Sequence, residues 1–535
     1  MNTKQLKAKV LDLAIHGKLL SPETVAELKK SPDYETADVL LEKIRKEKEG
    51  KIAKGELKRD KKDCYIFVGD DKRHYEKFAD GTVKDIEDEI PFDVPEGWAW
   101  CRLGNIVLFE RGITFPSSAK QLEKTDNNIP CIRTANVQEE LTLDDLIFVD
   151  KTFIKNNIKK IVKEDDIIFS SANSRELVGK ASYVNKIDIE MTFGGFVLVI
   201  RSKINKYVFY FLKREFLFGN FMGESTQTTN IANINTEKLS NILMPVPPQT
   251  EQTLIIERIK YWFKIIADFD KNIKNLETLV NLSKSKILDL AIHGKLVPQD
   301  PNDEPAAELL EKLRSEKEEK IAKGELKRDK NDSYIYKGSD NCYYEKLNGT
   351  ENCIDDEIPF EIPANWTWKR GKEIFLPMFT RTPGKTGTFK YIDIDAIDNK
   401  QHKITIPKTI EAINAPSRAS RGVEAGDVLF SMVRPYLENI ALIKEEHAAC
   451  IASTGFYVCR PNKAVYPDYL FYLMTSTYII KGLNEFMKGD NSPSISSDDI
   501  AKWLYPIPPI EEQKRIVSCI KRLYMDLDQI QTNVI

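Results

Sequence analysis

The sequence predicts an α+β protein in which two α/β domains are separated by two long helices that form an antiparallel coiled coil. Three observations predict this fold: the chain repeats itself, heptad patterns follow each repeat, and short β-type runs alternate with helical stretches in between. The repeat also predicts a pseudo-two-fold, circular arrangement. The expected segments are 1–97 (N-terminal helix and charged helical linker), 98–248 (first variable domain), 249–365 (central heptad helix and charged helical linker), 366–508 (second variable domain) and 509–535 (C-terminal heptad helix).

The repeat consists of blocks that recur in the same order. Leu11–Leu19 reads LDLAIHGKL, and Leu288–Leu296 reads the same nine residues. The blocks KIAKGELKRDK and DEIPF also occur twice. The 535 residues therefore divide into two halves, roughly 1–274 and 278–535, and such a length is enough for about three to four domains.

Each half combines a near-identical part with a divergent part. In the divergent parts Arg133 aligns with Asp393, and SANSRE (171–176) lies opposite SMVRPY (431–436). Identity in one part and variation in the other indicate a constant scaffold that carries two different recognition domains. If these domains read a sequence, they read different sequences, so the target is expected to be an asymmetric site in two parts.

A heptad pattern follows the first PxPPxxEQ element, PVPPQTEQ (245–252). Proline is tolerated in a first helical turn, and the glutamate after it favours the positive end of the helix dipole. Apolar residues then recur at alternating steps of four and three, with one serine among them: Ile255, Ile259, Trp262, Ile266, Phe269, Ile273, Leu276, Val280, Ser283, Ile287 and Leu290. Such a seam predicts a coiled coil; an ordinary amphipathic core helix is the alternative.

The same pattern follows the second element, PIPPIEEQ (506–513), and stops where the sequence ends. It comprises Ile516, Ile520, Leu523, Leu527, Ile530 and Val534. The missing part lies at the other end of the chain, where Leu6, Val10 and Leu13 match Ser283, Ile287 and Leu290. By this count Ile535 corresponds to Lys274 and Met1 to Thr278. The second long helix is therefore predicted to form from the C-terminal and N-terminal segments placed end to end.

The length of these helices leads to a hypothesis about spacing. A helix of about 45 residues is about 65 Å long, which is about two turns of B-DNA. Two domains at opposite ends of an antiparallel pair would meet DNA about one turn apart. A footprint over a single contiguous half-site would contradict this hypothesis.

A charged segment lies between each long helix and each variable domain, at about 33–75 and 303–340. Its mixture of Lys, Arg and Glu is typical of a solvated helix or helical hairpin with i,i+4 ion pairs. A contact with phosphates or with a partner protein is the alternative.

The variable domains contain runs of both types. The expected strands are Ile167–Phe169, Phe196–Ile200, Val428–Phe430 and Phe456–Cys459, and the expected helices are Tyr207–Phe218 and Tyr469–Leu483.

Candidate DNA contacts are polar, planar or cationic side chains on loops beside these strands, because arginine offers a bidentate fork to guanine and asparagine does so to adenine. In the first domain they are Arg111, Thr114, Arg133, Asn136, Ser171, Asn173, Arg175 and, in the loop 225–230, Thr226 and Asn230. In the second they are Arg381, Thr382, Lys385, Arg434, Tyr436 and, in the loop 489–494, Asn491 and Ser494. Each alone is more often a salt-bridge or turn residue.

The sequence contains no catalytic constellation. An amino-methyltransferase needs an Asn/Asp-Pro-Pro-aromatic loop, and the Pro-Pro pairs here are VPPQ and IPPI. GKT (384–386) lacks the first glycine of a phosphate-binding loop, since Phe379 stands there, and FGGF (193–196) is not GxGxxG. His16 and His293, each followed by glycine, are expected to cap helices. Neither a metal ligand set nor catalysis by this chain is expected.

Composition excludes several protein classes. The net charge is −3, so the chain is not a uniformly basic polyanion binder. The N-terminus is polar, no apolar run approaches the length of a membrane span, and eight scattered cysteines form no CxxC motif. The expectation is a cytoplasmic protein without a membrane partner.

These motifs together resemble the specificity (S) subunit of type I restriction-modification systems. The resemblance covers nearly the whole chain and rests on the duplicated plan, the segments DEIPFDVPEGWAWCRLGNI (88–106) and DEIPFEIPANWTWKRGKEI (356–374), GDVLFSMVRPYLENIAL (426–442), and the two PxPPxxEQ elements that lead into heptad helices. One departure is that the first domain lacks the SxxRP pattern that the second has at Ser431, Arg434 and Pro435.

The resemblance implies a division of labour. The variable domains would be target recognition domains, each reading one half of a split site in double-stranded DNA, and the helices would set the gap and dock two methyltransferase (M) subunits. Restriction (R) subunits would join afterwards. S-adenosylmethionine, ATP and magnesium would belong to the partners, and no cofactor to this chain. Because the chain is acidic overall, we expect weak DNA binding by the isolated chain.

Two other classes of protein compete with this interpretation. A fused restriction-methylation polypeptide would carry methylase and nuclease motifs, which are missing from this sequence. A coiled-coil scaffold whose domains bind proteins without reading DNA would fit the heptads equally well. It predicts no sequence-selective DNA protection in the presence of the M partner.

Overall fold

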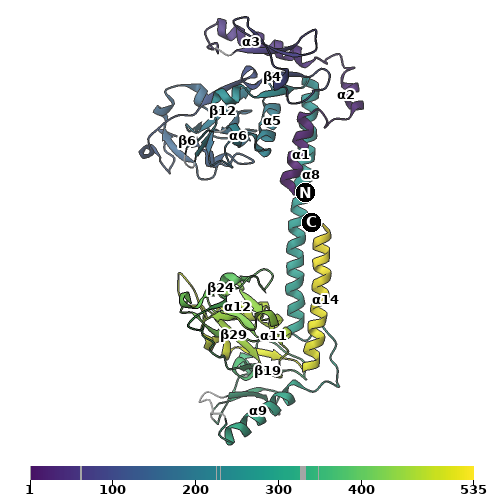
Figure 1. Ribbon diagram of the computed structural model, residues 1–535, viewed down its shortest axis with the longest axis vertical. Coiled ribbons are helices and arrows are strands. Elements are labelled where there is room, and N and C mark those ends of the chain that lie inside the picture. The colour runs from purple at the N-terminus through teal and green to yellow at the C-terminus, as the bar shows by residue number, and fades with distance from the viewer. Residues whose placement is uncertain are drawn as a thin grey trace. The chain divides into compact units, whose positions relative to one another are not determined.

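The computed structural model describes residues 2–60, 63–224, 226–228, 231–325, 333–347 and 349–534. The chain forms two compact units, Met1–Asn272 and Ile273–Ile535, and in each a helix and a three-stranded sheet precede a domain that mixes strands and helices. The predicted α+β fold with a duplicated plan is therefore confirmed (Figure 1).

A continuous helix of 44 residues, α8 (Gln249–Ile292), begins directly after the first Pro-Pro pair, as predicted. In the first unit α1 (Thr3–Ile15) lies beside the first part of α8, and in the second unit α14 (Ile510–Val534) lies beside its last part (Figure 1). The predicted joining of the two terminal helices end to end stays a prediction.

Equivalent contacts hold both helix pairs together. The Nζ atom of Lys7 lies 5.7 Å from the ring centre of Phe263, and that of Lys284 lies 5.3 Å from the ring centre of Tyr524. The Tyr524 hydroxyl also donates to the carbonyl oxygen of Lys284 at 3.1 Å. Figure 1 shows that the two helices of each pair run in opposite directions.

The predicted heptad seam is only partly buried. Ile255, Ile259 and Val280 are buried, as a coiled-coil seam requires. By contrast, Trp262 is 43% exposed and Phe269 is 45% exposed. The exposed seam positions of α8 therefore alternate with buried ones, since Ile266 between them is only 6% exposed.

The charged linkers are helical only in their first part, so the prediction of a wholly helical linker is wrong. After each helix the sequence alternates aromatic and aliphatic residues (CYIFV, SYIYK), which favour strands over helices. We call the resulting three-stranded antiparallel sheets the first and second linker sheets. The elements are α2 (Pro22–Leu28), α3 (Ala37–Ala53), β1 (Cys64–Val68), β2 (His74–Phe78) and β3 (Val83–Asp85), and then α9 (Ala306–Ala322), β16 (Ser333–Lys337), β17 (Tyr343–Leu347) and β18 (Thr350–Cys353).

The first variable domain is built on small sheets in the strand orders β10-β8-β12-β5, β11-β6-β7, β13-β14-β9 and β15-β4. Its elements are β4 (Ala99–Arg102), α4 (Leu103–Ile106), β5 (Val107–Arg111), β6 (Asn128–Ile132), β7 (Ile147–Asp150), β8 (Ile167–Ser170), β9 (Ala172–Asn173), β10 (Ala181–Tyr183), β11 (Thr192–Phe193), β12 (Val197–Ser202), α5 (Asn205–Leu217), α6 (Asn220–Glu224), β13 (Thr226–Thr228), β14 (Ile231–Asn233), α7 (Thr236–Ser240) and β15 (Leu243–Val246).

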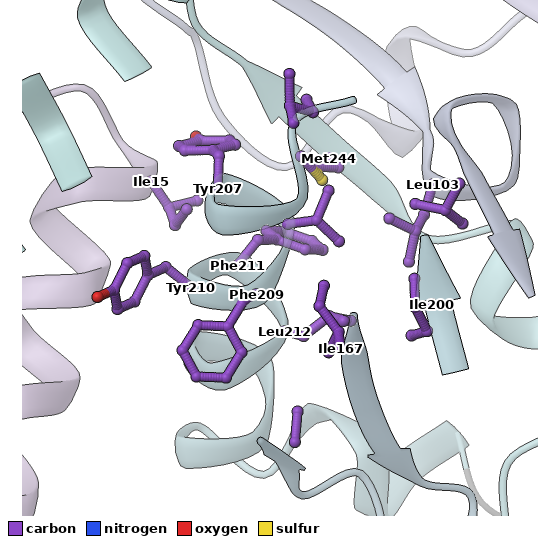
Figure 2. Close-up of a cluster of buried hydrophobic side chains, with 14 of the residues drawn as sticks. Ile15, Leu103, Ile167, Ile200, Tyr207, Phe209, Tyr210, Phe211, Leu212 and Met244 are labelled. Atoms are coloured by element: carbon purple, nitrogen blue, oxygen red, sulfur yellow. The ribbon is translucent and has the colours of Figure 1, made fainter. Parts of the chain in front are cut away.

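The core of the first unit lies between helix α5 and the four-stranded sheet. Phe211 and Leu212 of α5 face Ile167 and Ile200 of the sheet, and Tyr207 turns toward α1 (Figure 2). Burial of each large apolar side chain contributes about 1.5–3 kcal/mol. This core joins the variable domain to the helix pair.

The second variable domain repeats this plan with strand orders β20-β29-β26-β27, β24-β21-β28-β25, β19-β30 and β22-β23. Its elements are β19 (Thr367–Arg370), α10 (Gly371–Ile374), β20 (Phe375–Leu376), β21 (Thr388–Ile392), β22 (Ile397–Asp398), β23 (Lys403–Ile404), β24 (Lys408–Glu411), β25 (Ala419–Gly422), β26 (Val428–Ser431), β27 (Ile440–Leu442), β28 (Ile451–Ser453), β29 (Phe456–Pro461), α11 (Pro467–Met474), α12 (Thr477–Asn484), α13 (Ser497–Lys502) and β30 (Leu504–Ile507). All four predicted strands are present, within one or two residues.

The predicted helix Tyr469–Leu483 is wrong in one respect, because the structure divides it into α11 and α12. Ser476 lies at the break and is buried. Its hydroxyl donates to the carbonyl oxygen of Leu473 at 2.6 Å and accepts from the amide of Ile479 at 3.4 Å. A serine that ends one helix and caps the next replaces the intrahelical hydrogen bonds at the break.

The glutamate of each PxPPxxEQ element has a role that the sequence did not reveal. Glu251 accepts a hydrogen bond from the indole nitrogen of Trp98 at 2.8 Å, and Glu512 accepts one from Trp366 at 3.0 Å. Both carboxylates are buried. They therefore fasten the first strand region of each variable domain to the start of a long helix.

The repeated LDLAIHGKL block also has the same structure in both units. His16 caps its helix and contacts the carbonyl oxygen of Asp12 through Nδ1 at 2.8 Å, and His293 does so with Asp289 at 2.7 Å. Each ring also stacks on a phenylalanine, with 3.9 and 4.0 Å between ring centres. These contacts confirm the prediction that both histidines cap the ends of helices.

Candidate nucleic-acid interface

In the first variable domain, two of the predicted loops meet at one edge. Strand β8 ends at Ser170, and β9, which follows it, pairs with β14, which in turn pairs with β13. Residues 172–173, 226–228 and 231–233 therefore form one small sheet. Thr226 lies in β13, whereas Asn230 lies outside the described residues.

The side chains on this edge differ in how far the protein already uses them. The Ser171 hydroxyl donates to the carbonyl oxygen of Phe196 at 3.0 Å. The Asn173 amide donates to the Ser170 hydroxyl at 3.3 Å, and its oxygen accepts from the next backbone amide at 2.8 Å. Arg175 is exposed and makes no hydrogen bond or ion pair with the described residues. Its guanidinium is therefore available to a ligand.

The turn at 193–196 brings the other predicted segments to the same edge. Ile113 forms a β-bridge with Gly194, whose amide donates to the carbonyl oxygen of Ile132 at 2.9 Å. The exposed Thr114 lies beside this turn. Phe196, at the end of the turn, is 65% exposed. Sequence reasoning missed Phe196, because a Gly-Gly pair before an aromatic residue gives no signal that the ring points outward.

The remaining candidates of the first domain bind the protein itself. Arg111 is exposed and donates weakly to Thr236 at 3.3 Å. Arg133 donates through Nη2 to the carbonyl oxygen of Asp145 at 2.6 Å. Asn136 is only 2% exposed, and its amide group bonds to two backbone atoms at 2.9 and 3.0 Å. The structure therefore places Asn136 inside a turn, away from solvent.

In the second variable domain, four predicted residues come together. Ser494 forms a β-bridge with the residue before Arg434, and the Arg434 guanidinium donates to the carbonyl oxygen of Asn491 at 3.1 Å. Tyr436 follows at the same turn and is 46% exposed. The two loops form one polar edge with an arginine and a phenol on its surface.

The backbone at Arg434 is left-handed, with φ of +48°. A non-glycine residue rarely adopts this conformation, and where it occurs the surroundings hold it in place. Here the Arg434 amide donates to the carbonyl oxygen of Pro493 at 2.8 Å. The 489–494 loop therefore fixes the direction in which Arg434 leaves the backbone.

Matching backbone bonds define how the two edges correspond. Ser170 and Ser431 are both the last residues of their strands. The backbone amide of the next residue donates to a carbonyl oxygen in the turn beside the neighbouring strand. This distance is 3.1 Å for Ser171 and 2.9 Å for Met432. The carbonyl oxygen of each of these residues accepts from an isoleucine amide at 2.9 Å. Ser171 and Met432 therefore occupy the same place.

This correspondence corrects the alignment expected from sequence, which set 171–176 opposite 431–436. The two segments are one residue out of register, because Ser170 and not Ser171 matches Ser431. Asn173 therefore lies opposite Arg434. The equivalence of Arg133 with Asp393 holds, since each precedes a short 3-10 helix.

The other candidates of the second domain lie on separate loops. The Arg381 guanidinium donates to the carbonyl oxygens of Ala448 and Cys450 at 2.7 and 3.3 Å, so it braces the backbone. Thr382 and Lys385 are exposed and have no partner among the described residues. Arg418 is also exposed, and sequence reasoning missed it because it stands outside any recognisable pattern.

A cavity of about 640 Å³ lies in the first unit where α1, α5 and α8 meet. Its walls carry four lysines: Lys7, Lys206, Lys213 and Lys260. Glu139 lies 2.5 Å from Nζ of Lys7 and 3.5 Å from that of Lys213. Burial lowers the pKa of Lys213. The excess of cations makes this hollow electropositive.

In the part of the chain that the structure describes, no group of three or more His, Cys, Asp or Glu side chains lies close enough to hold a metal ion. Within the same residues, none of the helices combines the length and apolar character needed to span a membrane.

Relatives of known function match most of this chain. The EcoEI specificity subunit of a type I restriction enzyme from Escherichia coli is 23% identical and covers 99% of this chain and 90% of its own length. The EcoKI specificity subunit from E. coli K12 is 22% identical over 82% of this chain and 85% of its own. The MjaVIII specificity subunit from Methanocaldococcus jannaschii is 23% identical over 80% and 87%.

Solved structures and a family model complete the comparison. The HsdS subunit from Thermoanaerobacter tengcongensis is 39% identical over 32% of this chain and 46% of that one, with a TM-score of 0.31. The S subunit from M. genitalium is 14% identical over 83% and 94%, with a TM-score of 0.27. The type I restriction modification DNA specificity domain matches residues 95–278 and again 363–535. Because these two matches cover more than half of its length, the chain belongs to the type I restriction-modification DNA specificity family.

Proposed function

We propose that each variable domain reads one half of a bipartite, asymmetric DNA site. The observation that carries this proposal is that equivalent positions on one shared frame hold different polar groups: Asn173 in the first domain and Arg434 in the second. Arginine pairs with guanine and asparagine with adenine in the major groove. Two frames with different groups at the same place suit two different half-sites.

The shared frame itself is held by equivalent buried ion pairs. In the first domain Asp166 binds Arg201 through two bonds of 2.7 Å each. In the second domain Asp427 binds Arg460 through bonds of 3.0 and 2.8 Å. Such bidentate pairs fix the orientation of the strands that end at the polar edges.

We also propose that the long helices set the gap between half-sites and dock methyltransferase subunits. The support is a stripe of exposed apolar side chains on α8 in the first unit, formed by Tyr261, Trp262, Ile265 and Phe269. Aromatic residues in a contiguous exposed patch are typical of protein interfaces. In the second unit Leu279 and Leu282 on α8, and Met525 and Ile530 on α14, are exposed as well.

In this proposal the chain supplies recognition and its partners supply chemistry. Two methyltransferase subunits would bring S-adenosylmethionine, and restriction subunits that join the complex would bring ATP and magnesium. The complex would act on DNA in the cytoplasm. No step of the reaction is assigned to a side chain of this protein.

The test is single-molecule mapping of methylated bases in host DNA after co-expression of this chain with its methyltransferase subunit. We expect a split motif with two unlike halves, methylated on both strands. Expression of the methyltransferase subunit alone is the control. A continuous motif, or no new methylation although a stable complex forms, would contradict the proposal and favour a scaffold that does not read DNA.

Variants assign the half-sites to their domains. Arg175→Ala is expected to weaken recognition of one half-site, and Arg434→Ala is expected to weaken recognition of the other. If the arginine contacts a base, the loss of binding free energy should be about 1–3 kcal/mol. Lys186→Ala, which removes an exposed lysine that pairs with Asp188, is the matched control. Binding to DNAs with substitutions in one half at a time measures the effect.

A further inference from the structure

The outer faces of the two linker sheets carry aromatic side chains in contact with one another. In the first linker sheet Tyr65, Phe67 and Tyr75 lie side by side, with ring centres 6.0 and 5.7 Å apart. All three are partly exposed. An exposed face of an antiparallel sheet is ordinarily polar, so three aromatic rings in a row need a reason.

The second linker sheet repeats this arrangement. Tyr334, Tyr336 and Tyr344 have ring centres 6.0 and 5.9 Å apart, and they are partly exposed as well. At one end of each row a tyrosine hydroxyl donates to an aspartate. In the first sheet Tyr75 donates to Asp71 at 2.6 Å, and in the second Tyr344 donates to Asp340 at 2.7 Å. We call these two faces the first and second aromatic rows.

An arginine from the preceding helix closes the other end of each row. The guanidinium of Arg45 on α3 lies 4.2 Å from the ring centre of Tyr65. That of Arg314 on α9 lies 3.8 Å from the ring centre of Tyr334. Both distances are within the range of cation–π contacts, so each helix and its sheet form one unit.

The opposite face of each linker sheet is fastened to its variable domain. Arg102 on β4 donates to the buried Glu76 at 3.0 and 3.1 Å, and Arg370 on β19 donates to Glu345 at 3.0 and 3.3 Å. The inner faces are therefore occupied by ion pairs. The aromatic rows are the faces that remain open.

The charges around the rows argue for a protein ligand and against a phosphate backbone. In the first sheet Arg73 pairs with Asp85 at 2.8 Å, and in the second Lys346 is opposite Glu351 in the strand pairing. These charges balance, whereas a surface that tracks DNA phosphates is rich in unopposed cations. Tyrosine, tryptophan and arginine are the residues that most often carry the binding energy of protein interfaces.

We propose that each aromatic row, in addition to the long helices, binds one of the two copies of the same protein partner. The two rows have equivalent residues in the two halves of the chain, whereas the variable domains differ. Two equivalent surfaces suit two copies of one ligand. The partner's surface would offer apolar groups to the rings and a cation to Asp71 or Asp340, the aspartates that end the rows. This inference rests on the proposed function for the identity of the partner, the methyltransferase subunit.

The test is the stoichiometry of the full-length chain with that subunit, measured by native mass spectrometry and by titration. Threonine keeps the preference for strand, so we choose Phe67→Thr and Tyr336→Thr, singly and together. The unchanged chain is expected to bind two copies. Each single variant should lose one copy at sub-micromolar concentration, and the double variant should bind at least about 30-fold more weakly, the size of a hot-spot loss.

Controls separate this result from misfolding. Ile158→Thr and Ile406→Thr replace exposed isoleucines in the variable domains and should leave two copies bound. Asp71→Asn with Asp340→Asn keeps an acceptor for the tyrosine hydroxyl and for the turn amide while removing the charge offered to the partner, and it should also weaken binding.

Two outcomes would overturn the proposal. Full affinity for two copies in the double variant and in the Asp71→Asn, Asp340→Asn pair would exclude the aromatic rows from the docking surface. Loss of DNA binding with two copies still bound would assign the rows to nucleic acid. The proposed function is tested separately, by whether the unchanged complex methylates a split motif. If it does, either result above rules out only the role of the aromatic rows, and if it does not, the proposed function fails.

Discussion

The base and the outer edge of each variable domain differ in how closely the two units match. At the base the units agree nearly atom for atom. Trp98 donates to Glu251 at 2.8 Å in one unit, and Trp366 donates to Glu512 at 3.0 Å in the other. At the outer edge one unit has a three-stranded sheet where the other has a left-handed turn and a loop.

This difference shows which part of each domain the fold depends on. The base contains buried charges and indoles whose hydrogen bonds have no substitute, so its geometry admits few alternatives. The edge contains Arg175 in one unit and Tyr436 in the other, both exposed. Residues at such exposed positions can change without a cost in packing. Specificity can therefore vary at these positions while the frame stays constant.

The largest effect is expected at the buried ion pairs of the base. Asp166→Ala and Asp427→Ala each leave an arginine without its buried partner, so each should lower the free energy of unfolding of its unit by about 3–5 kcal/mol. Urea unfolding measures the loss. Equal losses in both units support the shared base.

A matched exposed pair supplies the control. Asp188→Ala removes the partner of Lys186, and both side chains are 76% exposed, so the expected loss is about 0–1 kcal/mol. A loss at Asp166 no larger than that at Asp188 would mean that the buried pair does not hold the frame.

A smaller effect should separate two candidates within the first domain. Asn136→Ala removes an amide that bonds to buried backbone, so stability should fall by about 1–3 kcal/mol. Arg175→Ala should change stability by less than about 0.5 kcal/mol and should weaken binding of the target DNA. Thermal unfolding and DNA titration of both variants measure the two effects. The opposite pattern would place Asn136 in recognition and Arg175 in the fold.

The smallest effect is expected from pH, and only in the second unit. Burial lowers the pKa of His402, and its Nδ1 atom has no hydrogen-bond partner among the described residues. The unfolded chain therefore binds the proton first as pH falls, and stability is lost below the unfolded value of about 6.5. Burial raises the pKa of Glu438, whose Oε2 atom lies 3.9 Å from Nε2 of His402, so the folded chain binds that proton first and this contribution partly offsets the loss.

Urea midpoints at pH 7.5 and 5.5 test this difference. The unchanged chain should lose more stability than His402→Gln over this interval. The first variable domain contains no histidine, so its unfolding should not respond in the same way. An equal loss in the variant and the unchanged chain would remove His402 as the cause.

Sequence patterns predicted the parts of this fold that follow from periodicity. The heptads and the Pro-Pro pairs located α8 and α14, because helices need an apolar stripe and tolerate proline only at their start. The strands β8 and β26 followed from β-branched runs. These signals are local, so a single sequence contains them.

Other features depended on contacts between distant residues. The division of the predicted helix at Ser476 depends on a buried hydroxyl, and the linker sheets depend on Arg102 and Arg370 beneath them. The strand pairing fixes the register of Asn173 against Arg434. The exposure of Phe196 depends on a turn whose sequence is not distinctive. None of these has a periodic signal.

The central claim is that two different domains on one frame read two different half-sites. The most direct measurement is methylation mapping with a chain in which residues 98–248 are replaced by a second copy of 366–508. The frame contacts at the base allow this exchange, because both domains meet the long helices through the same tryptophan and glutamate. We predict methylation of a motif that contains one half-sequence twice. The original asymmetric motif, or its loss while the complex with the methyltransferase subunit still assembles, would contradict the claim.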